Sequence, residues 1–360
     1  MLLFAFSIAL QAAAVAAQAA DASAGETAEQ RYIIAIERIW DRAGHSAFTD
    51  ILLVGDDLYC AFREGSGHIP GLNGLIRVLR SRDRKHWESV ALLEERHVDL
   101  RDPKLSLAPD GRIVLNMGAS YYHGTKRLAI ESRVAFGSPD GGHFGRPEKV
   151  VLPPAIATKF DWLWRITWHE GFAWACVQQV SADRGGPRAL QLVRSRDAIH
   201  YDHVATLDVE LPSETTLRFL DDGTLLAMIR CESKPPLGRI GIAKPPYTAW
   251  TITPSNKRFG GPNFIELPGG SWLAGSRDYS GAKPLAALWR FDRESKQFTD
   301  FLTLPSGGDC SYPGFAVDAK QNKVYVSYYS SHEGRAAIYL AMLRLDAITE
   351  PTAATQSFSK

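Results

Sequence analysis

The sequence predicts an all-β protein, a six-bladed β-propeller of four-stranded antiparallel blades, and three observations carry this prediction. A unit made of a strand-like run, a tight polar turn and a second run recurs six times, with turns near residues 57, 111, 171, 223, 270 and 322. A further hairpin phrase recurs between these units. Gly stands at most of the turns and allows the positive φ that short hairpin loops need. Two hairpins in a period of about fifty residues, repeated along the chain, are typical of a propeller.

The hairpin phrase reads Ser-x-Asp-x-x-His-aromatic and occurs as SRDRKHW (81–87), SPDGGHF (138–144) and SRDAIHY (195–201). Each copy lies between two apolar-alternating runs, so we predict that it forms the turn between the third and fourth strands of a blade. Its Asp can accept hydrogen bonds from turn amides there, and its aromatic ring can pack beneath the hairpin. We interpret the phrase as part of the frame, because these turns lie at the outer edge of the blades and the ligand face of a propeller lies elsewhere. Its three His fall on different blades, too far apart to share a metal ion.

The two ends of the repeat array predict how the ring closes. The last unit lacks an outer strand, whereas residues 31–40, RYIIAIERIW, read as a strand without a blade of its own. We predict that this strand completes the last blade by pairing with residues 335–345, which protects two sheet edges at once. The propeller domain then spans residues 31–346, between a flexible N-terminal segment at 20–30 and a C-terminal tail at 347–360.

Residues 1–19 read as a signal peptide, because they are apolar and Ala17-Gln18-Ala19 fits a cleavage site of the A-x-A type. We therefore expect a secreted or periplasmic protein. The alternative is a single membrane anchor, although the run is short for spanning a membrane and dilute in large apolar residues.

Charge and cysteine content exclude some classes of partner. Lys and Arg number 41 and Asp and Glu 40, so the chain has no basic field for nucleic acid. Its four cysteines lie far apart without a C-x-x-C pair, which argues against a zinc site, and we expect buried free thiols. We expect a monomer that has a carbohydrate partner, binds no nucleic acid and does not insert stably into a membrane.

The function has to come from the rim of the central channel, where the inner strands of a propeller begin. Polar residues recur there in successive repeats, and several are Arg, whose planar guanidinium suits a carboxylate or sulfate. Trp and Tyr nearby suit the apolar face of a sugar ring. We therefore expect a site for an acidic sugar, with no metal and no organic cofactor. The candidate substrate-binding residues are Arg63, Arg230, Arg277, Arg101, Glu64, Trp164, Arg165, Asn263 and Asp278.

The hairpin phrase resembles the Asp box of the sialidase superfamily, and the resemblance spans essentially residues 31–345. Sialidases hold a substrate carboxylate with three Arg and use a Tyr nucleophile helped by a Glu. The resemblance implies Tyr312, in GGDCSYPGF, as the nucleophile and Glu214, followed by LDDGTLLAMIR, as its helper. The anion ligands that it implies are Arg230, Arg277 and Arg63.

The chain departs from the sialidase pattern at two places. Its first inner strand reads AFTDILL, where the family carries an Arg in a Phe-Arg-Ile-Pro motif. The loop that would carry the family's acid Asp reads GSGHIPGLNG and offers His68 instead, while Asp102, in the segment RDPK, is a second candidate acid.

Three functions follow from these residues. The first is a sialidase-like glycoside hydrolase, in which Tyr312 attacks, Glu214 takes its proton and His68 or Asp102 protonates the leaving oxygen. The second is a polysaccharide lyase for uronic-acid glycans, in which His68 and Tyr312 remove a proton beside a carboxylate that Arg neutralises. The third is a propeller that binds sugar without chemistry.

Overall fold

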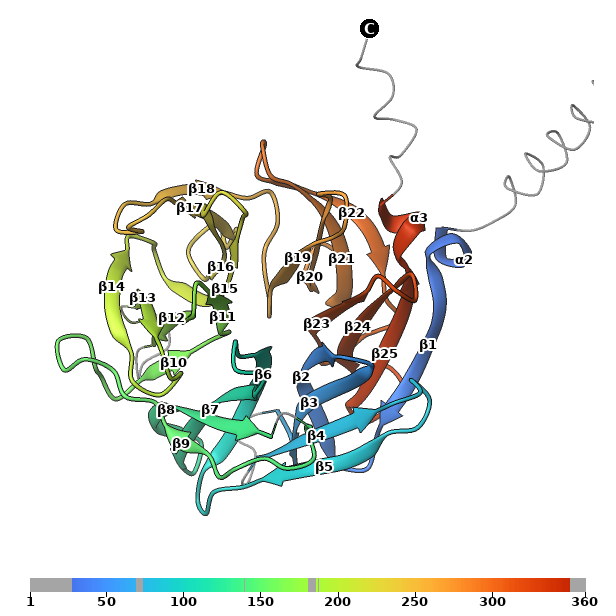
Figure 1. Cartoon of the computed structure of the whole chain (residues 1–360), viewed down its shortest axis with the longest axis horizontal. Helices are drawn as coiled ribbons and strands as arrows, with labels where there is room; N and C mark the ends of the chain where they lie inside the picture. Colours follow the sequence, from blue (N-terminus) through green and yellow to red (C-terminus); the bar gives the residue numbers. More distant parts are fainter. Residues whose placement is uncertain (1–27, 69–73, 139, 181–185, 187, 350–360) are drawn as a thin grey trace, which may run out of the picture.

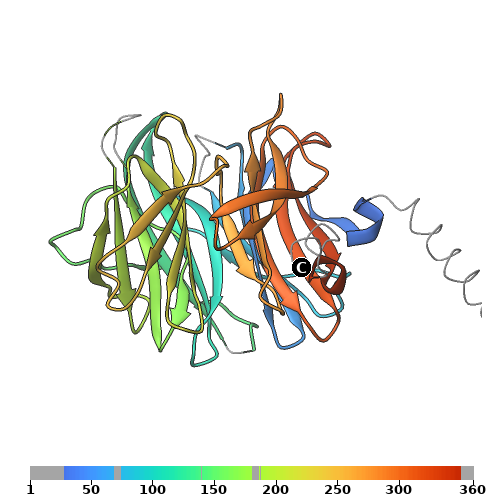
Figure 2. The ribbon, with the colours of Figure 1, turned by 90° about the horizontal axis from the view of Figure 1, so that it is seen from above.

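The computed structural model describes residues 28–68, 74–138, 140–180, 186 and 188–349, and these form six antiparallel sheets around a central axis (Figure 1). The prediction of an all-β, six-bladed propeller is confirmed. Figure 2 shows the ring from its side, with the strands running from one face of the ring to the other. Loops between strands therefore gather on two faces, and the inner strand of every blade lines the axis.

The strands of each blade follow one another from the axis outward. Blade one contains β2 (His45–Val54), β3 (Asp57–Gly65), β4 (Leu75–Ser81) and β5 (Glu88–Leu93). Blade two contains β6 (Asp99–Leu107), β7 (Ile113–His123), β8 (Lys126–Gly137) and β9 (Glu148–Lys149). Blade three contains β10 (Asp161–Leu163), β11 (Thr167–His169), β12 (Phe172–Gln179), β13 (Ala189–Ser195) and β14 (Asp202–Leu207). Its inner strand is interrupted, because β10 and β11 both pair with β12.

The second half of the chain repeats this order. Blade four contains β15 (Pro212–Phe219), β16 (Leu225–Cys231), β17 (Arg239–Ala243) and β18 (Thr251–Pro254). Blade five contains β19 (Asn263–Glu266), β20 (Trp272–Asp278), β21 (Leu285–Asp292) and β22 (Gln297–Thr303). Blade six contains β23 (Cys310–Asp318), β24 (Lys323–Ser330), β25 (Ala337–Arg344) and β1 (Ile33–Trp40).

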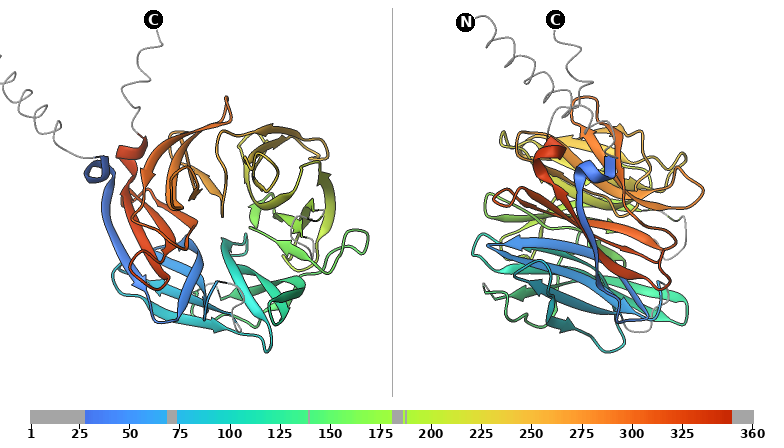
Figure 3. Two further views of the ribbon diagram at one scale, coloured as in Figure 1. Left: turned by 180° about the vertical axis from the view of Figure 1, so that it is seen from behind. Right: turned by 90° about the vertical axis from the view of Figure 1, so that its right-hand side faces the viewer.

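The predicted closure of the ring is present. β1 pairs antiparallel with β25, from Ile33 opposite Leu343 to Trp40 opposite Ile338. The blue strand β1 lies along the outer side of the red strands of blade six (Figures 1 and 3). Two short helices, α2 (Ala28–Tyr32) and α3 (Leu345–Thr349), flank this pair of strands.

The apolar core is divided among the blade boundaries, as expected for sheets that pack face to face around a ring. Buried clusters join blades one and two around Met117, blades two and three around Val177, and blades three and four around Leu217. Further clusters join blades four and five around Trp289 and blades five and six around Leu288. Each blade is therefore held mainly by its two neighbours.

The Asp-containing hairpin phrases lie in the β4–β5, β8–β9 and β13–β14 connections, at the outer edge of their blades, as predicted. Oδ1 of Asp83 accepts the amides of Lys85 and His86 at 2.9 and 2.8 Å. The third copy repeats this geometry, because Oδ1 of Asp197 accepts the amides of Ile199 and His200 at 2.8 Å each. The phrase is part of the frame in these turns.

The four cysteines agree with the sequence-based expectation. All four cysteines are buried free thiols. Within the residues that the structure describes, no helix has the length and apolar character needed to cross a membrane. The segments expected to be a signal peptide (1–19) and most of a C-terminal tail (347–360) lie outside the described residues.

Bulges in the inner strands turn particular side chains toward the axis. The pairing register shifts between Ala47 and Asp50 in β2, and equivalent shifts occur in β6 and β23. Phe48, Asp102 and Tyr312 occupy the first position of these bulges with φ of 61°, 51° and 55°. A non-Gly residue in this left-handed region is strained, and such strain often marks a functional position. Three blades thus have a residue in the left-handed conformation at the same position of the inner strand, beside the central axis.

Candidate functional site

Tyr312 and Glu214 form the centre of the candidate site. The Tyr312 hydroxyl donates a hydrogen bond of 2.5 Å to Oε1 of Glu214, so the expected contact is present. Oε2 of Glu214 accepts Nη1 of Arg230 at 2.9 Å and the amide of Gly261 at 2.8 Å. Tyr312 is 8% and Glu214 5% exposed. The bulge in β23 and the start of β15 place these two side chains together across the axis.

The electrostatics of this pair assign the proton to the phenol. Burial raises the pKa of Tyr312 well above its usual value, and the negative charge of Glu214 raises it further. Burial alone would raise the pKa of Glu214, but the charge of Arg230 and the hydrogen bond from Tyr312 hold that pKa below its usual value. At neutral pH the pair is therefore a neutral phenol beside a carboxylate, which can accept the phenolic proton when the oxygen reacts.

Two of the predicted arginines lie at this centre. Arg230 donates from Nε to Oε1 of Glu232 at 2.7 Å, in addition to its bond to Glu214. Arg277 donates from Nε to the carbonyl of Cys310 at 2.7 Å and from Nη2 to the hydroxyl of Tyr329 at 3.0 Å. The side chains of Arg230 and Arg277 are 18% and 16% exposed. Within the described part of the chain, Nη1 of Arg277 has no hydrogen-bond partner, so this guanidinium retains donors for a ligand.

Trp164 and Asn263, two other predicted residues, contact Tyr312 and the residue that follows it. The Trp164 ring is 2% exposed and packs 5.9 Å from the ring of Tyr312. Asn263 donates to the carbonyl of Pro313, directly after Tyr312, at 3.1 Å. Both side chains fix the nucleophile candidate, and their burial leaves little surface for a sugar.

Several residues that were predicted to bind substrate instead pair with other groups of the fold, which corrects the expectation that they contact a ligand. Arg63 is fully buried, and its Nε donates to Asp99 at 2.7 Å while its Nη1 donates to the carbonyl of Gly67 at 2.9 Å. Arg101 is 4% exposed and forms ion pairs with Asp99 and Asp102. Both arginines shape the frame of the site and have no exposed face for a ligand.

Three more predicted residues face other parts of the fold. Glu64 accepts the indole of Trp40 at 2.6 Å and pairs with Arg77. Arg165 binds Asp50 through both terminal nitrogens, at 2.6 and 3.0 Å. Asp278 accepts the amide and hydroxyl of Ser280 at the end of β20. The position of a polar residue at a strand end is therefore not enough to predict that its side chain contacts the Tyr312–Glu214 pair.

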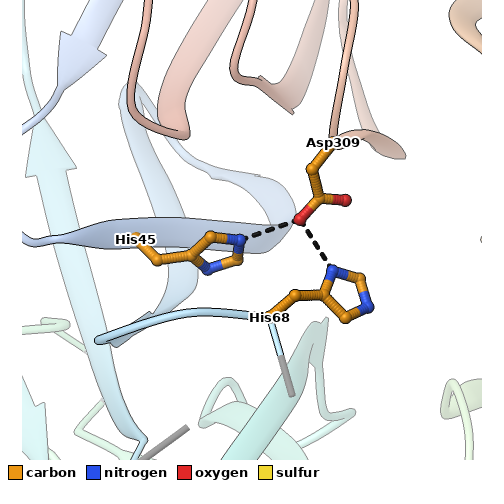
Figure 4. A group of neighbouring side chains, drawn as sticks. All are labelled: His45, His68 and Asp309. Carbon is orange, nitrogen blue, oxygen red and sulfur yellow. Dashed lines mark hydrogen bonds and ion pairs between the residues drawn. The ribbon is translucent and has the colours of Figure 1, made fainter. Parts of the chain in front are cut away.

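Asp309, just before β23, accepts hydrogen bonds from two histidines (Figure 4). Its Oδ2 lies 2.8 Å from Nε2 of His45 and 2.7 Å from Nδ1 of His68, and its Oδ1 accepts the hydroxyl of Tyr329 at 2.8 Å. Burial alone would raise the pKa of Asp309, but the bonds from the two histidines hold it well below its usual value. Arg277 also lies near, with Nη2 at 3.6 Å from Oδ1. Asp309 is therefore a carboxylate shared by four neighbours.

His45, His68 and Asp309 also have donor atoms close enough to hold a metal ion. The two nitrogen–oxygen distances are those of hydrogen bonds, however. A tetrahedral zinc ion with bonds of about 2.0–2.2 Å would hold its donor atoms about 3.3–3.6 Å apart. A metal would also lie beside the positive charge of Arg277. The geometry thus favours protons over a metal in this cluster.

Sequence reasoning missed some residues of the site. Tyr329 lies in the run YVSYYSS and reads as part of an apolar strand, and His45 precedes the first inner strand without any motif. Phe48 reads as a core aromatic, since its left-handed backbone leaves no mark in the sequence. Arg188 is half-buried beside Glu232, and burial lowers its pKa despite that carboxylate. No local sequence pattern marks these four residues, because their place in the site depends on neighbours that only the folded chain brings together.

Comparison with known proteins supports the fold. No family model matches the chain, and no curated protein matches it in sequence. A protein of unknown function from Dyadobacter fermentans is 17% identical, with 87% of this chain and 98% of that chain covered and a TM-score of 0.75. Trypanosoma rangeli sialidase, in complex with the inhibitor DANA, is 14% identical with a TM-score of 0.67. The match covers 85% of this chain and only 56% of that sialidase.

A third similar structure is the α-L-arabinanase of Penicillium chrysogenum complexed with arabinobiose. It is 12% identical, with 87% of this chain and 99% of that chain covered and a TM-score of 0.65. At such identities the likeness shows a shared fold. Similar propellers thus include proteins named as a sialidase and as an arabinanase, and the reaction of this chain has to be argued from its own site.

Proposed function

We propose that the protein is a glycosidase that cleaves an acidic, carboxylate-bearing sugar from a glycan, with Tyr312 as nucleophile and Glu214 as its base. One observation carries this proposal: the hydrogen bond of 2.5 Å between a buried neutral phenol and a carboxylate that Arg230 keeps ionised. A neutral phenol is a weak nucleophile, and an adjacent base is the usual means of activating one.

The reaction proceeds in two balanced steps. The Tyr312 oxygen attacks the anomeric carbon, its proton passes to Glu214, and the bond to the leaving oxygen breaks as that oxygen takes a proton from an acid. Water then attacks the same carbon and gives a proton to the base that the acid has become, the sugar–Tyr312 bond breaks, and Glu214 returns its proton to the phenol oxygen. A neutral nucleophile suits a sugar whose reacting carbon bears or adjoins a carboxylate, because a carboxylate nucleophile would be repelled by it.

Arg230 and Arg277 are the residues to hold the acidic group. They come from blades four and five, both stand beside the Tyr312–Glu214 pair, and both remain partly exposed. Arg277 adds a free Nη1 in the described structure, and a guanidinium binds a carboxylate best when two of its N–H groups are available. The fold shared with proteins named as a sialidase and an arabinanase adds an argument by analogy for glycoside hydrolysis. We also propose export by the N-terminal segment and a monomeric state.

The test is a screen of the purified protein against sialosides, uronic-acid oligosaccharides and sulfated glycans, read for new reducing ends and for ultraviolet absorbance. A glycosidase releases reducing ends without absorbance. Absorbance would come from the double bond made by a lyase and would contradict the proposal, as would binding without any product.

The nucleophile is tested on the substrate that the screen identifies. Tyr312→Phe is expected to abolish turnover and to leave binding largely intact, because the ring remains. Tyr201→Phe is a matched control, since Tyr201 is also buried but lies at the outer edge with an unpartnered hydroxyl. A 2-deoxy-2-fluoro or 3-fluoro analogue of the cleaved sugar should label the peptide that contains Tyr312, and labelling at another residue would refute its role.

A further inference from the structure

We propose that His68 is the acid that protonates the leaving oxygen, and that Asp309, anchored by His45, positions it. This inference rests on the glycosidase function proposed above and identifies the proton donor that the reaction needs. The three residues come from opposite ends of the propeller sequence: His45 and His68 belong to blade one, and Asp309 precedes the inner strand of blade six. Only the closed ring brings them together.

The orientation of His68 is that of a proton-transfer residue. A carboxylate can only accept, so Nδ1 of His68 carries the proton shared with Oδ2 of Asp309 at 2.7 Å. Nε2 lies on the other side of the ring, directed away from Asp309 (Figure 4), and has no partner among the described residues. The side chain is 42% exposed, so Nε2 can meet a ligand. A carboxylate that fixes one ring nitrogen leaves the other aimed and stabilises the imidazolium.

His68 also lies beside the nucleophile candidate. Its ring packs edge-on against Phe48, with centroids 5.0 Å apart, and the ring of Tyr312 packs against the same Phe48 at 5.2 Å. Tyr329 and Arg277 connect the two groups on another side, because both contact Asp309 and both lie against Tyr312. A sugar that reaches Tyr312 from the exposed side would therefore have its leaving oxygen near this histidine.

His45 has a different role, although it binds the same carboxylate oxygen. Its side chain is 10% exposed, and its Nδ1 is buried without a hydrogen-bond partner in the described structure. It has no nitrogen with which to reach a ligand. His45 instead holds Asp309 in place from β2, so that the carboxylate faces His68.

Asp102, the other candidate acid, is less suited to the task. Burial raises its pKa, which would favour a proton donor. Its side chain is only 1% exposed, however, and its Oδ2 accepts Nε of Arg101 at 3.1 Å. A donor must come within hydrogen-bond reach of the substrate oxygen. His68 has that access and Asp102 does not.

The step is balanced as follows. Protonated His68 donates the Nε2 proton to the leaving oxygen while the Tyr312 oxygen attacks, and neutral His68 then takes a proton from the water that hydrolyses the sugar–Tyr312 bond. Among the residues that the structure describes, the charged and titratable groups around this imidazole are Asp309 and, behind it, His45, Tyr329 and Arg277, with Arg101 on the face of Phe48 at 5.0 Å. Of these, the Asp309 carboxylate is hydrogen-bonded to His68.

The experiment compares substrates with good and poor leaving groups, because loss of the acid affects only the second kind. The probes are the 4-methylumbelliferyl and methyl glycosides of N-acetylneuraminic acid and glucuronic acid, used in whichever series the wild type cleaves. His68→Ala is expected to lower kcat/KM for the methyl glycoside by about 10²–10⁴-fold and to change it less than about tenfold for the methylumbelliferyl glycoside. His68→Gln keeps the size of the side chain and should behave alike.

The control and the positioning residue complete the design. His86→Ala removes a histidine that binds Asp83 through Nδ1 at 2.6 Å in the same way, but on an outer hairpin, and should leave both substrates unaffected. Asp309→Asn should lower kcat/KM for the methyl glycoside more than for the methylumbelliferyl glycoside, because His68 loses the partner that orients its ring. A merely structural Asp309 would lower activity on both substrates equally.

The outcomes separate this inference from the proposed function. If Tyr312→Phe is inactive but the His68 variants affect both substrates equally or neither, the inference fails and the glycosidase stands. A selective loss in Asp102→Asn instead would assign the acid to Asp102. Activity that dialysis against a chelator abolishes and zinc restores would overturn the hydrogen-bonded description of the cluster. If Tyr312→Phe retains full turnover, or no probe is cleaved, the proposed function itself fails.

Discussion

Asp50→Ala should destabilise the whole propeller, because Asp50 lies on the inner strand of blade one and contacts two other blades. Asp50 is fully buried in β2 and binds Arg165 of blade three at 2.6 and 3.0 Å. Its Oδ2 also accepts the amide of Leu105 in blade two at 2.8 Å. One carboxylate therefore ties three successive blades together at the axis.

The magnitude follows from what the substitution leaves behind. Arg165 would keep a guanidinium that is only 7% exposed and has lost its counter-charge, and removing one partner of a buried pair costs about 3–5 kcal/mol. The amide of Leu105 also loses its acceptor, so the upper half of that range is expected. Folded domains have about 5–15 kcal/mol of stability in total, and the loss would be a large fraction of it.

The assay is urea unfolding at pH 7, followed by tryptophan fluorescence, with free energies from linear extrapolation. Asp300→Ala is the matched control, because it breaks an ion pair of 2.6 Å with Lys257 in which Asp300 is 75% exposed. Such surface pairs contribute about 0–1 kcal/mol. The double variant Asp50→Leu with Arg165→Met should cost less than Asp50→Ala, since it strands no charge. Equal losses for Asp50→Ala and Asp300→Ala would refute the reasoning.

Three further predictions concern the frame. Asp197→Ala should lower the free energy of unfolding by about 1–3 kcal/mol, because two turn amides lose their acceptor, while kcat/KM stays unchanged; lost activity at an unchanged melting temperature would mean that the turn belongs to the site. Burial lowers the pKa of Lys104 from 10.5 to about 8, so the unfolded chain binds more protons between these pH values. The free energy of unfolding of the wild type minus that of Lys104→Met, measured by urea unfolding, should therefore rise by roughly 3 kcal/mol from pH 8 to 10.5. A difference that does not change with pH would contradict a Lys104 pKa lowered by burial. Removing residues 1–40 deletes β1 and should expose the edge of β25, so that light scattering detects aggregates, and a monodisperse truncated protein would contradict the closure argument.

The sequence sufficed for the fold because a propeller repeats its local pattern. Turn glycines, alternating runs and an orphan strand at 31–40 each have a local meaning, and together they determined the number of blades and the closure. The same symmetry sends strand ends to one rim, which is why Tyr312 and Glu214 were expected to meet and do so at 2.5 Å.

The details of the site depend on features that local pattern does not encode. Arg63 and Arg277 both end a second strand, yet Arg63 is buried against Asp99 of the next blade and Arg277 remains partly exposed. Which of two equivalent arginines is neutralised depends on a partner from another repeat. The contact between His45 and Asp309 joins residues 264 positions apart, and no local motif marks either one.

The pairing of β1 with β25 also determines when the ring can close during synthesis and folding of the chain. β1 is the first strand of the ring to be synthesised and its partner β25 is the last, so the ring cannot close until β25 has been made. Contacts between such distant segments form slowly, because a long loop has to close before they stabilise anything. During that interval a free β1 can pair with the β25 of another copy of the chain as well as with its own. At high concentration, two chains that exchange β1 would form a swapped dimer with every native contact of the monomer, and dilution before refolding should select the closed ring.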